Sequence, residues 1–373
     1  MADTTVDLIY SNYEQTINST SQRGYIGWSA IGAKCERAIY YDWRWVSKKH
    51  VEGRIARLFE TGHREEDRVI ENLRKLPNVE VFDSPEGGGQ FAVSPMAKGH
   101  LRGHLDCVVK NLPEYPGEAV LVDVKTANTK RFDRVVANGM AVESPQYVAQ
   151  ATGYMGLMNL KRAAYLYVCK DDDRLHIEWL EFDQALFDQL VAKAERIIAT
   201  DRPPMRFDDD PKNFTCRYCD HKAICQEESV AAQVNCRTCQ SGEPVENGAW
   251  RCTLTDSEIP LNKQRIGCDE HLYLTPMVPF ANPMTGEYGP DYQLYDHHDA
   301  GGFFLNRRAS HPQGFQHYTS KEIAAVPNTL LIDEELQGLR WAFAGELVAG
   351  AECPPELEAL HPNFDGELVD AEG

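Results

Sequence analysis

Two aspartates and a lysine on neighbouring predicted strands form the most informative pattern in the sequence. Asp106 ends the run Gly-His-Leu-Asp, and after sixteen residues Asp123 and Lys125 follow in the run Val-Asp-Val-Lys. Side chains alternate between the faces of a strand, so Asp123 and Lys125 share one face while the neighbouring valines point into a core. If residues 103–110 and 119–126 pair as an antiparallel hairpin, Asp106 lies beside Asp123.

This arrangement would bring two carboxylates and one ammonium group together at a sheet edge. Two close carboxylates repel each other unless a cation lies between them. Oxygen ligands suit Mg²⁺ or Mn²⁺, and such an ion stabilises charge on a phosphodiester and on its leaving oxygen. Lys125 would orient an attacking water or help to deprotonate it. The pattern favours metal-dependent phosphodiester hydrolysis, while the alternative is an exposed Asp–Lys pair on a solvent-facing strand.

The helices predicted on either side of the hairpin carry further polar residues. The helix over 55–76 has His63 and Glu66 on its otherwise apolar face. The helix over 141–159 has a polar stripe at intervals of four residues, made of Gln146, Gln150 and Tyr154. A histidine on an apolar face is commonly a core residue, and Gln and Tyr are ordinary on helices. Their order around the hairpin is what makes these residues informative.

In this order the elements resemble the PD-(D/E)xK nuclease superfamily and its RecB-like branch. The proline of the superfamily's name is absent, because Leu105 precedes Asp106. The resemblance implies an α/β fold, with a restriction-endonuclease-like mixed sheet flanked by helices. It also implies a ligand set for Mg²⁺ or Mn²⁺ made of His63, Asp106, Asp123 and the Val124 carbonyl.

The same resemblance assigns the remaining polar residues. Lys125 would position the attacking water, and Glu66 would support the ligands from behind. The Gln150-to-Tyr154 element looks like the QxxxY element of RecB-like nucleases, which lies beside the active site and contacts DNA. Gln150, Tyr154 and Gln146 would therefore bind substrate.

Eleven cysteines are many for a cytosolic chain, where clustered cysteines indicate metal before disulfides. The first group joins one upstream cysteine to a downstream cluster: Cys35, then Cys216, Cys219 and Cys225. This spacing fits a closed four-thiolate site that joins the two ends of a domain, with zinc left open. It resembles the iron–sulfur nucleases, which include AddB-type nuclease domains and CRISPR-associated four-cysteine RecB-like nucleases. The resemblance implies a structural 4Fe–4S cluster and metal-dependent exonucleolytic cutting of DNA.

A second cysteine group follows: Cys236, Cys239, Cys252 and Cys268. A pair of cysteines with two residues between them, followed by two later ones, suits a tetrahedral zinc ribbon. His271 could replace Cys252 or Cys268, although four thiolates are favoured. Trp250 suits a hydrophobic plug in a ribbon too small to fold on its own core.

The length of 373 residues predicts two or three structural units. We expect a nuclease-like domain at 1–230 with the iron–sulfur staple, a zinc-ribbon-like module at 231–275, a small α+β module at 276–350 and an acidic tail at 351–373. Further predicted elements are a helix from about Ser29 within 25–46, strands near 79–82, 163–169 and 175–181, a loop over 111–118, and helices over 183–200 and 333–349.

The net charge of −19 argues against non-specific nucleic-acid binding, but the charge is uneven. Residues 331–373 hold eleven acidic residues and one basic residue, as a solvated tail would. A locally basic track near the site is predicted at Lys130, Arg131, Arg134, Lys161 and Arg162. The N-terminus has no apolar segment of a secretory signal and no run spans a bilayer, which predicts the cytosol of a bacterium or a phage-infected host and no membrane partner.

The sequence thus predicts a bacterial or bacteriophage DNA exonuclease for recombination or DNA processing. Its partners would be DNA and a recombination annealase or other DNA-processing protein, and an oligomer is compatible with the residues. Two rival hypotheses stay open. One is a structure-selective endonuclease that uses the same residues, and the other is a catalytically silent DNA- or protein-binding subunit of a recombination or CRISPR-adaptation complex.

Overall fold

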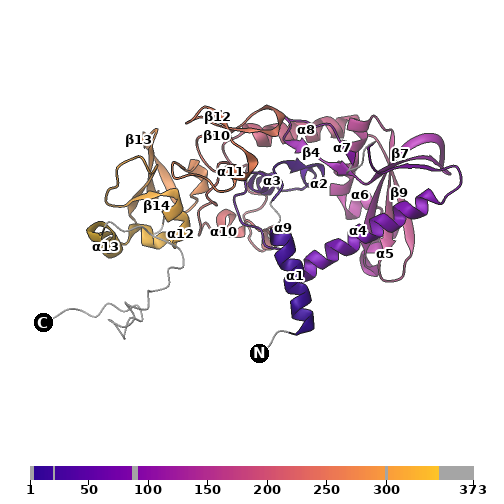
Figure 1. Cartoon of the computed structure of the whole chain (residues 1–373), viewed down its shortest axis with the longest axis horizontal. Helices are drawn as coiled ribbons and strands as arrows, with labels where there is room; N and C mark the ends of the chain where they lie inside the picture. The colour runs from indigo at the N-terminus through magenta and orange to yellow at the C-terminus, as the bar shows by residue number, and fades with distance from the viewer. Residues whose placement is uncertain (1–3, 20–21, 86–90, 299–300, 344–373) are drawn as a thin grey trace.

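The computed structural model describes residues 4–19, 22–85, 91–298 and 301–343 (Figure 1). Its largest sheet has five strands in the order β2-β6-β7-β8-β9. These strands are β2 (Glu80–Phe82), β6 (Cys107–Leu112), β7 (Tyr115–Ala127), β8 (Arg162–Cys169) and β9 (Leu175–Glu181). β7 and β8 run parallel, and the other neighbours are antiparallel. The predicted mixed α/β fold, with a sheet flanked by helices, is confirmed.

Helices cover both faces of this sheet. On one face α4 (Gly53–Arg74) packs Val69, Ile70 and Leu73 against the alternate valines of β7. Those residues recur at helical spacing, so burying this stripe drives α4 onto the sheet. On the other face lie α5 (Thr129–Asn138), α6 (Met140–Glu143) and α7 (Pro145–Met158). The sequence predicts one helix over 141–159, but Ser144 and Pro145 divide it in two, because proline is favoured only in a first turn.

The β6–β7 hairpin is longer than the sequence predicts. Leu112 pairs with Tyr115, so most of the predicted loop over 111–118 belongs to the strands. The pairing register shifts between Lys110 and Leu112, where Asn111 has φ 64°. Asparagine tolerates this left-handed conformation, and an irregularity of this kind lets a turn-rich segment remain in a ladder.

An unpredicted helix, α1 (Thr5–Ser19), packs along α4 and projects with it from the body as an arm (Figure 1). The two backbones approach closely at Gly53, where an added Cβ would lie 1.9 Å from the Tyr10 carbonyl oxygen. The predicted helix from Ser29 is instead two short helices, α2 (Trp28–Ile31) and α3 (Glu36–Trp43).

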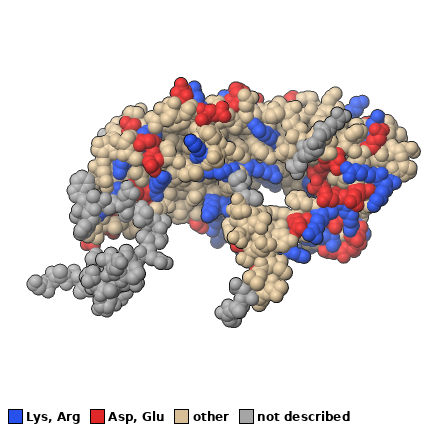
Figure 2. Space-filling model, in the orientation of Figure 1, with Lys and Arg blue, Asp and Glu red and all other residues tan. Residues whose placement is uncertain are grey.

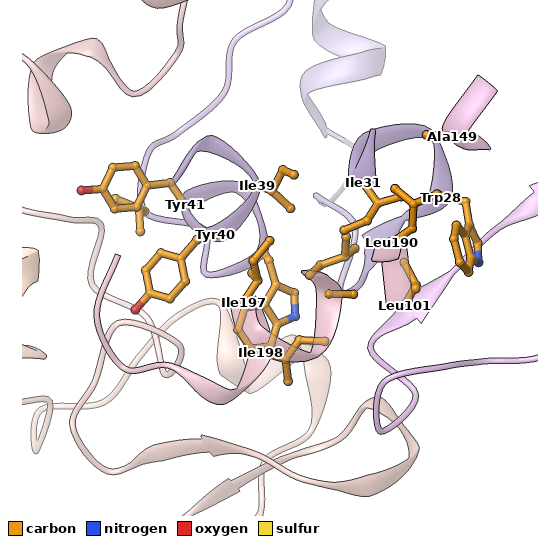
Figure 3. Packing of buried hydrophobic residues seen from close by; sticks show 14 of the residues in the cluster. Trp28, Ile31, Ile39, Tyr40, Tyr41, Leu101, Ala149, Leu190, Ile197 and Ile198 are labelled. Atoms are coloured by element: carbon orange, nitrogen blue, oxygen red, sulfur yellow. The ribbon is translucent and has the colours of Figure 1, made fainter. Parts of the chain in front are cut away.

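The aromatic-rich segment that holds α2 and α3 forms the centre of the main core. Figure 3 shows its side chains meeting those of α7 and of α8 (Gln184–Ala199). The labelled residues are Trp28, Ile31, Ile39, Tyr40, Tyr41, Leu101, Ala149, Leu190, Ile197 and Ile198. All ten are buried.

Short elements connect and extend this core. Next to it lie β1 (Ile26–Gly27), β3 (Phe91–Ala92), β4 (Leu101–Arg102), β5 (His104–Leu105), α9 (Phe214–Arg217) and α10 (Lys222–Cys225). A three-stranded antiparallel sheet follows, with β10 (Gly242–Pro244), η1 (Glu246–Gly248), β11 (Trp250–Cys252), β12 (Ser257–Glu258) and α11 (Leu261–Gln264). No described helix has the length and hydropathy that a membrane span requires.

The C-terminal described part is a four-stranded sheet with short helices. It contains η2 (Thr275–Met277), β13 (Ala281–Gly289), β14 (Tyr292–His297), β15 (Phe303–Arg307), β16 (His317–Thr319), α12 (Ser320–Ala325), η3 (Asn328–Ile332) and α13 (Glu334–Phe343). The predicted last helix begins as expected, but the acidic tail lies outside the described residues. Buried side chains from all three predicted units pack in one continuous cluster, and the unit boundaries stay predictions.

A buried arginine connects the cysteine-rich segment to the N-terminal core. Arg237 is fully buried, with its guanidinium 3.6 Å from the centre of the Trp45 ring and 5.0 Å from that of Trp250. It donates to the carbonyls of Trp43 and Gly24 at 2.7 and 3.0 Å. Within the described residues it has no carboxylate partner, so ring faces and carbonyl dipoles compensate for its burial.

Trp250, also fully buried, lies against Trp43 at the same junction. We expect Trp250→Ala to lower the free energy of unfolding by about 3–5 kcal/mol, because it removes a large buried side chain and leaves a cavity. Met205→Ala is the control, since Met205 is 89% exposed, and its effect should be within about 0.5 kcal/mol. Urea unfolding of both variants measures the difference, and equal midpoints would contradict the packing described.

Candidate active site and cysteine cavities

The sheet register brings the two predicted aspartates together. Cys107 pairs with Val122, so Asp106 stands opposite Asp123 at the end of the β6–β7 ladder. Asp106 Oδ2 accepts a hydrogen bond of 2.9 Å from the Val124 N–H. Asp123 is 1% exposed and forms an ion pair with Lys125. The hairpin prediction is confirmed, with the valines of β7 on the opposite face.

The electrostatics follow from burying these charges side by side. Burial raises the pKa of Asp106 well above its usual value, and the Asp123 carboxylate adds to the shift. Burial alone lowers the pKa of Lys125, but the Asp123 and Asp106 carboxylates outweigh it and the net pKa shift is upward. Lys125 is therefore a firmly held cation, while the raised pKa of Asp106 favours its protonated form when no other cation is near.

A cavity of about 490 Å³ opens beside Asp106, and we call it the catalytic cavity. α4 contributes His63 and Glu66 to its lining, and α7 contributes Gln150 and Tyr154. Burial raises the pKa of Glu66, His63 lowers it and Asp123 raises it further, so these charges act on one another. The structure thus gathers predicted residues from three separate elements around one cavity.

Tyr154 is held in place from two sides. Gln150 Nε2 donates to the Tyr154 hydroxyl at 3.5 Å, and burial raises the pKa of Tyr154 to about 12. A Cβ added to Gly103 would lie 2.7 Å from the Tyr154 ring, so only glycine fits there. Gln146 differs from the prediction, because it does not line the cavity. Its backbone packs against Gly32 at the end of α2 instead.

Several cavity residues were missed by the sequence analysis. Arg23, Tyr25 and His104 line the catalytic cavity. Tyr147 and Tyr165 lie near Lys125, whose Nζ is 5.1 and 5.6 Å from the centres of their rings. The alternation of β8 could have indicated Tyr165, because Tyr165 pairs with Asp123 in register. No pattern in the sequence before residue 27 indicated that Arg23 and Tyr25 would line the catalytic cavity.

Part of the predicted basic track is already neutralised. Arg134 lies 2.9 Å from Glu143, and Arg162 lies 3.1 Å from Glu118 and also pairs with Glu181. The prediction for Arg134 and Arg162 is therefore not supported by their contacts. Lys130, Arg131 and Lys161 form no ion pair among the described residues, and Arg131 donates to the Ser144 hydroxyl at 3.0 Å.

The first cysteine group lines one cavity of about 180 Å³, formed by Cys35, Cys216, Cys219 and Cys225 with neighbouring residues. The Ala38 N–H donates to Cys35 Sγ at 3.4 Å, and Arg37 Nη1 donates to Cys225 Sγ at 3.9 Å. Burial raises the pKa values of Cys216 and Cys219, and the other thiols of the group add to both shifts. The fold therefore joins cysteines separated by about 180 positions, as the spacing predicted.

The second cysteine group lines a smaller cavity of about 30 Å³, formed by Cys236, Cys239, Cys252 and Cys268 with neighbouring residues. The Ser241 N–H donates to Cys239 Sγ at 3.4 Å. His271 also borders the cavity, but its Nε2 lies 3.2 Å from the Thr238 hydroxyl and 3.1 Å from the Asn235 carbonyl. That nitrogen is occupied, whereas His271 Nδ1 is buried without a hydrogen-bond partner among the described residues, so His271 stays an alternative to one of the four thiols.

In the described ranges, no group of three or more His, Cys, Asp or Glu side chains has an arrangement that could hold a metal ion as it stands. Donor residues nevertheless line the three cavities described above. The metal assignments therefore rest on the chemistry of the donor sets and on cavity size.

The sequence matches the profile of the PD-(D/E)XK nuclease superfamily over residues 27–226, more than half of the chain. This chain belongs to the PD-(D/E)XK nuclease superfamily. The matched part holds the hairpin, α4, α7 and the first cysteine group.

Solved structures of other nucleases are similar to this superfamily member. One is an alkaline exonuclease from Laribacter hongkongensis, 13% identical, with a TM-score of 0.36, 51% of this chain covered and 91% of the other. Another is a phage-related exonuclease from Haemophilus somnus, 16% identical, with a TM-score of 0.28, 37% of this chain covered and 69% of the other. No curated protein sequence matches the chain.

We expect Gly103→Ala to lower nuclease activity about 10- to 100-fold, because the new Cβ displaces the Tyr154 ring and the groups it supports. Gly62→Ala is the matched control. Gly62 lies in α4 with open space around it, so alanine should add about 0.5–1 kcal/mol of stability and leave activity unchanged. Turnover and thermal unfolding of both variants test this, and full activity in Gly103→Ala would refute the close packing.

Proposed function

We propose that this protein is a metal-dependent DNA exonuclease that hydrolyses phosphodiester bonds. The observation that carries the proposal is the position of Asp106, bonded to the Val124 N–H at the end of the β6–β7 ladder, close to Asp123 and Lys125 and on a cavity that His63 and Gln150 also line. Superfamily membership supports phosphodiester hydrolysis. DNA as the substrate and cutting from an end are our further inferences.

The donor set fits a hard divalent cation. Asp106 and Asp123 offer oxygen ligands, and the Val124 carbonyl and His63 would complete the set. Burial, together with the Asp123 carboxylate, raises the pKa of Asp106, and a bound divalent ion would favour the ionised form of both carboxyl groups. Bound Mg²⁺ or Mn²⁺ would supply Lewis acidity to the scissile phosphodiester.

The protein's own residues would orient the reactants. Lys125 is fixed by its ion pair with Asp123 and would donate a hydrogen bond to the attacking water. Tyr154 and Gln150 support each other and would hold the scissile strand from α7. Glu66, half-buried behind His63, would steady that side chain through its charge. Cleavage would leave a 5′-phosphate.

We expect Lys125→Met to lower kcat about 10²- to 10⁴-fold, because a positioned proton-transfer or water-orienting group contributes about that much. Lys110→Met is the control, since Lys110 is an exposed residue of β6. Degradation of end-labelled linear DNA in Mg²⁺ or Mn²⁺ is measured for both variants.

A covalently closed circle distinguishes the modes of cutting. Degradation of linear DNA with an intact circle supports the exonuclease. Cutting of the circle favours the structure-selective endonuclease, and no cleavage of either favours the silent subunit.

We further propose that the protein belongs to the RecB-like iron–sulfur branch and carries two cysteine-bound metal centres. A cavity that holds one water molecule has a volume of about 10–15 Å³. The 180 Å³ cavity is large for a single ion and suits a multi-atom 4Fe–4S cluster held by Cys35, Cys216, Cys219 and Cys225. The 30 Å³ cavity suits one Zn²⁺ held by Cys236, Cys239, Cys252 and Cys268.

Each centre would stabilise the fold where its cysteines come together. We expect Cys35→Ser to lose iron and keep zinc, and Cys236→Ser to lose zinc and keep iron, because the two cavities are separate. Elemental analysis of anaerobically purified protein measures both metals, and each variant is the control for the other. Joint loss of both metals from properly folded protein would contradict two independent centres.

A further inference from the structure

Two more cavities adjoin the catalytic cavity, and all three share Arg23. The middle cavity, of about 310 Å³, shares Arg23, Tyr25 and Gly27 with the catalytic cavity. The third, of about 610 Å³, shares Arg23 and Lys49 with the middle one. We call these three contiguous spaces the Arg23 groove. The groove leads from the paired aspartates to the junction of α1 with the cysteine-rich segment.

The charge of the groove changes sign along its length. The catalytic end is acidic, with Asp106, Glu66 and other carboxylates. The third cavity is lined by four basic side chains and, among the described residues, by no Asp or Glu: Arg23, Lys48, Lys49 and Arg265. In a chain with 57 acidic and 38 basic residues, such a lining is a marked local departure. We therefore name it the basic cavity.

Three of these four cations are available to a ligand. Lys49 lies 2.7 Å from Asp42, but Arg23, Lys48 and Arg265 form no ion pair within the described part of the chain. In the space-filling view an opening passes between the α1–α4 arm and the body, and basic side chains gather along its rim (Figure 2). Unpaired cations in a concave surface attract a polyanion.

Arg265 is held in position before any ligand arrives. Its guanidinium lies 4.1 Å from the centre of the Trp45 ring, and the Arg237 guanidinium lies 3.6 Å from the centre of the same ring. It also donates to the Gln22 carbonyl. A fixed side chain loses little freedom when it binds a phosphate, so these contacts favour recognition over a merely solvated charge.

We propose that the Arg23 groove is a track for a single strand of DNA, and that Arg265 brings the cysteine-rich segment into contact with its phosphates. This inference rests on the proposed function, since it extends the same site. Cavities of 310 to 610 Å³ admit ligands of about one or two nucleotides, whereas a duplex is far wider. Tyr25, which is partly exposed, lines the catalytic end and offers ring surface for an unstacked base.

The test is the affinity for a labelled oligothymidylate, measured by fluorescence anisotropy with Asp123→Asn in every protein to block cleavage. We expect Arg265→Glu to weaken binding about tenfold or more, as the loss of a charged hydrogen bond requires. The slope of log affinity against log salt should fall by about 0.7 for each phosphate that the variant no longer neutralises. Arg23→Glu should act in the same way.

Lys263→Glu is the matched control, because Lys263 lies two residues from Arg265, is exposed, and lines none of the three cavities. Its effect should stay within about twofold. Equal weakening by Lys263→Glu and Arg265→Glu, or an unchanged affinity in Arg265→Glu, would overturn the track. Tighter binding of duplex DNA or of single-stranded RNA, with the same dependence on Arg265, would overturn the assignment to single-stranded DNA.

A second measurement separates this proposal from the proposed function. A dinucleotide can occupy the catalytic cavity but is too short to extend from there to Arg265. Its rate of hydrolysis in Mn²⁺, by protein with Asp123 intact, should therefore be equal in wild type and in Arg265→Glu. If wild type binds oligothymidylate through Arg265 but cleaves no DNA, the nuclease proposal fails and the track remains. If wild type cleaves both substrates and Arg265→Glu binds normally, the track alone fails.

Discussion

The structure depends on one constraint: two buried carboxyl groups on adjacent strands must be held close to each other. Asp106 and Asp123 face each other only because β6 and β7 pair in one register, and a shift of one residue would send Asp123 to the face that α4 covers. The bond from the Val124 N–H and the ion pair to Lys125 fix both side chains. α4 and α7 then close the remaining sides, so the packing of the helices follows from the register of one hairpin.

A second constraint joins the cysteine-rich segment to this core. Arg237 and Arg44 are both buried among aromatic rings, and Arg44 Nη1 donates to the Arg237 carbonyl at 2.7 Å. Burial lowers the pKa values of both guanidinium groups, so each needs carbonyl and π contacts to remain charged inside the protein. Such contacts tolerate little movement. They hold Trp45 in place, and through it one wall of the Arg23 groove.

Local patterns made much of the fold predictable. The apolar residues of α4 recur at helical spacing and the valines of β7 alternate along a strand, because these are the positions that burial requires to be apolar. In the structure both sets of residues are buried against each other. The Asp106–Asp123 contact was predictable because a hairpin converts sequence spacing into register. Gln146 shows the limit of such reasoning. Its spacing from Gln150 placed it in the polar stripe of α7, but the spacing did not reveal that Gly32, at the end of α2, would pack against the Gln146 backbone.

Features that rest on distant contacts were not predictable. The α1 arm depends on the approach of Tyr10 to Gly53, and α1 buries no residue of its own to give a strong stripe. The position of Arg23 beside the active site depends on the distant pairing of β1 with β4, which no local pattern encodes. The cysteine spacing predicted convergence, whereas the sizes of the two cavities emerged only from the packed structure.

The two ends of the Arg23 groove have different origins in the chain. The catalytic end lies almost wholly within residues 27–226, the part that matches the superfamily. The basic cavity takes one wall from within that part, at Lys48 and Lys49, and its other walls from residues 17–19, 233–235 and 265 on either side of it. Part of the proposed substrate path is therefore encoded outside the stretch that holds the catalytic residues. A lineage could exchange the flanking stretches and redirect the nuclease to another nucleic-acid structure while its inherited catalytic residues stayed unchanged.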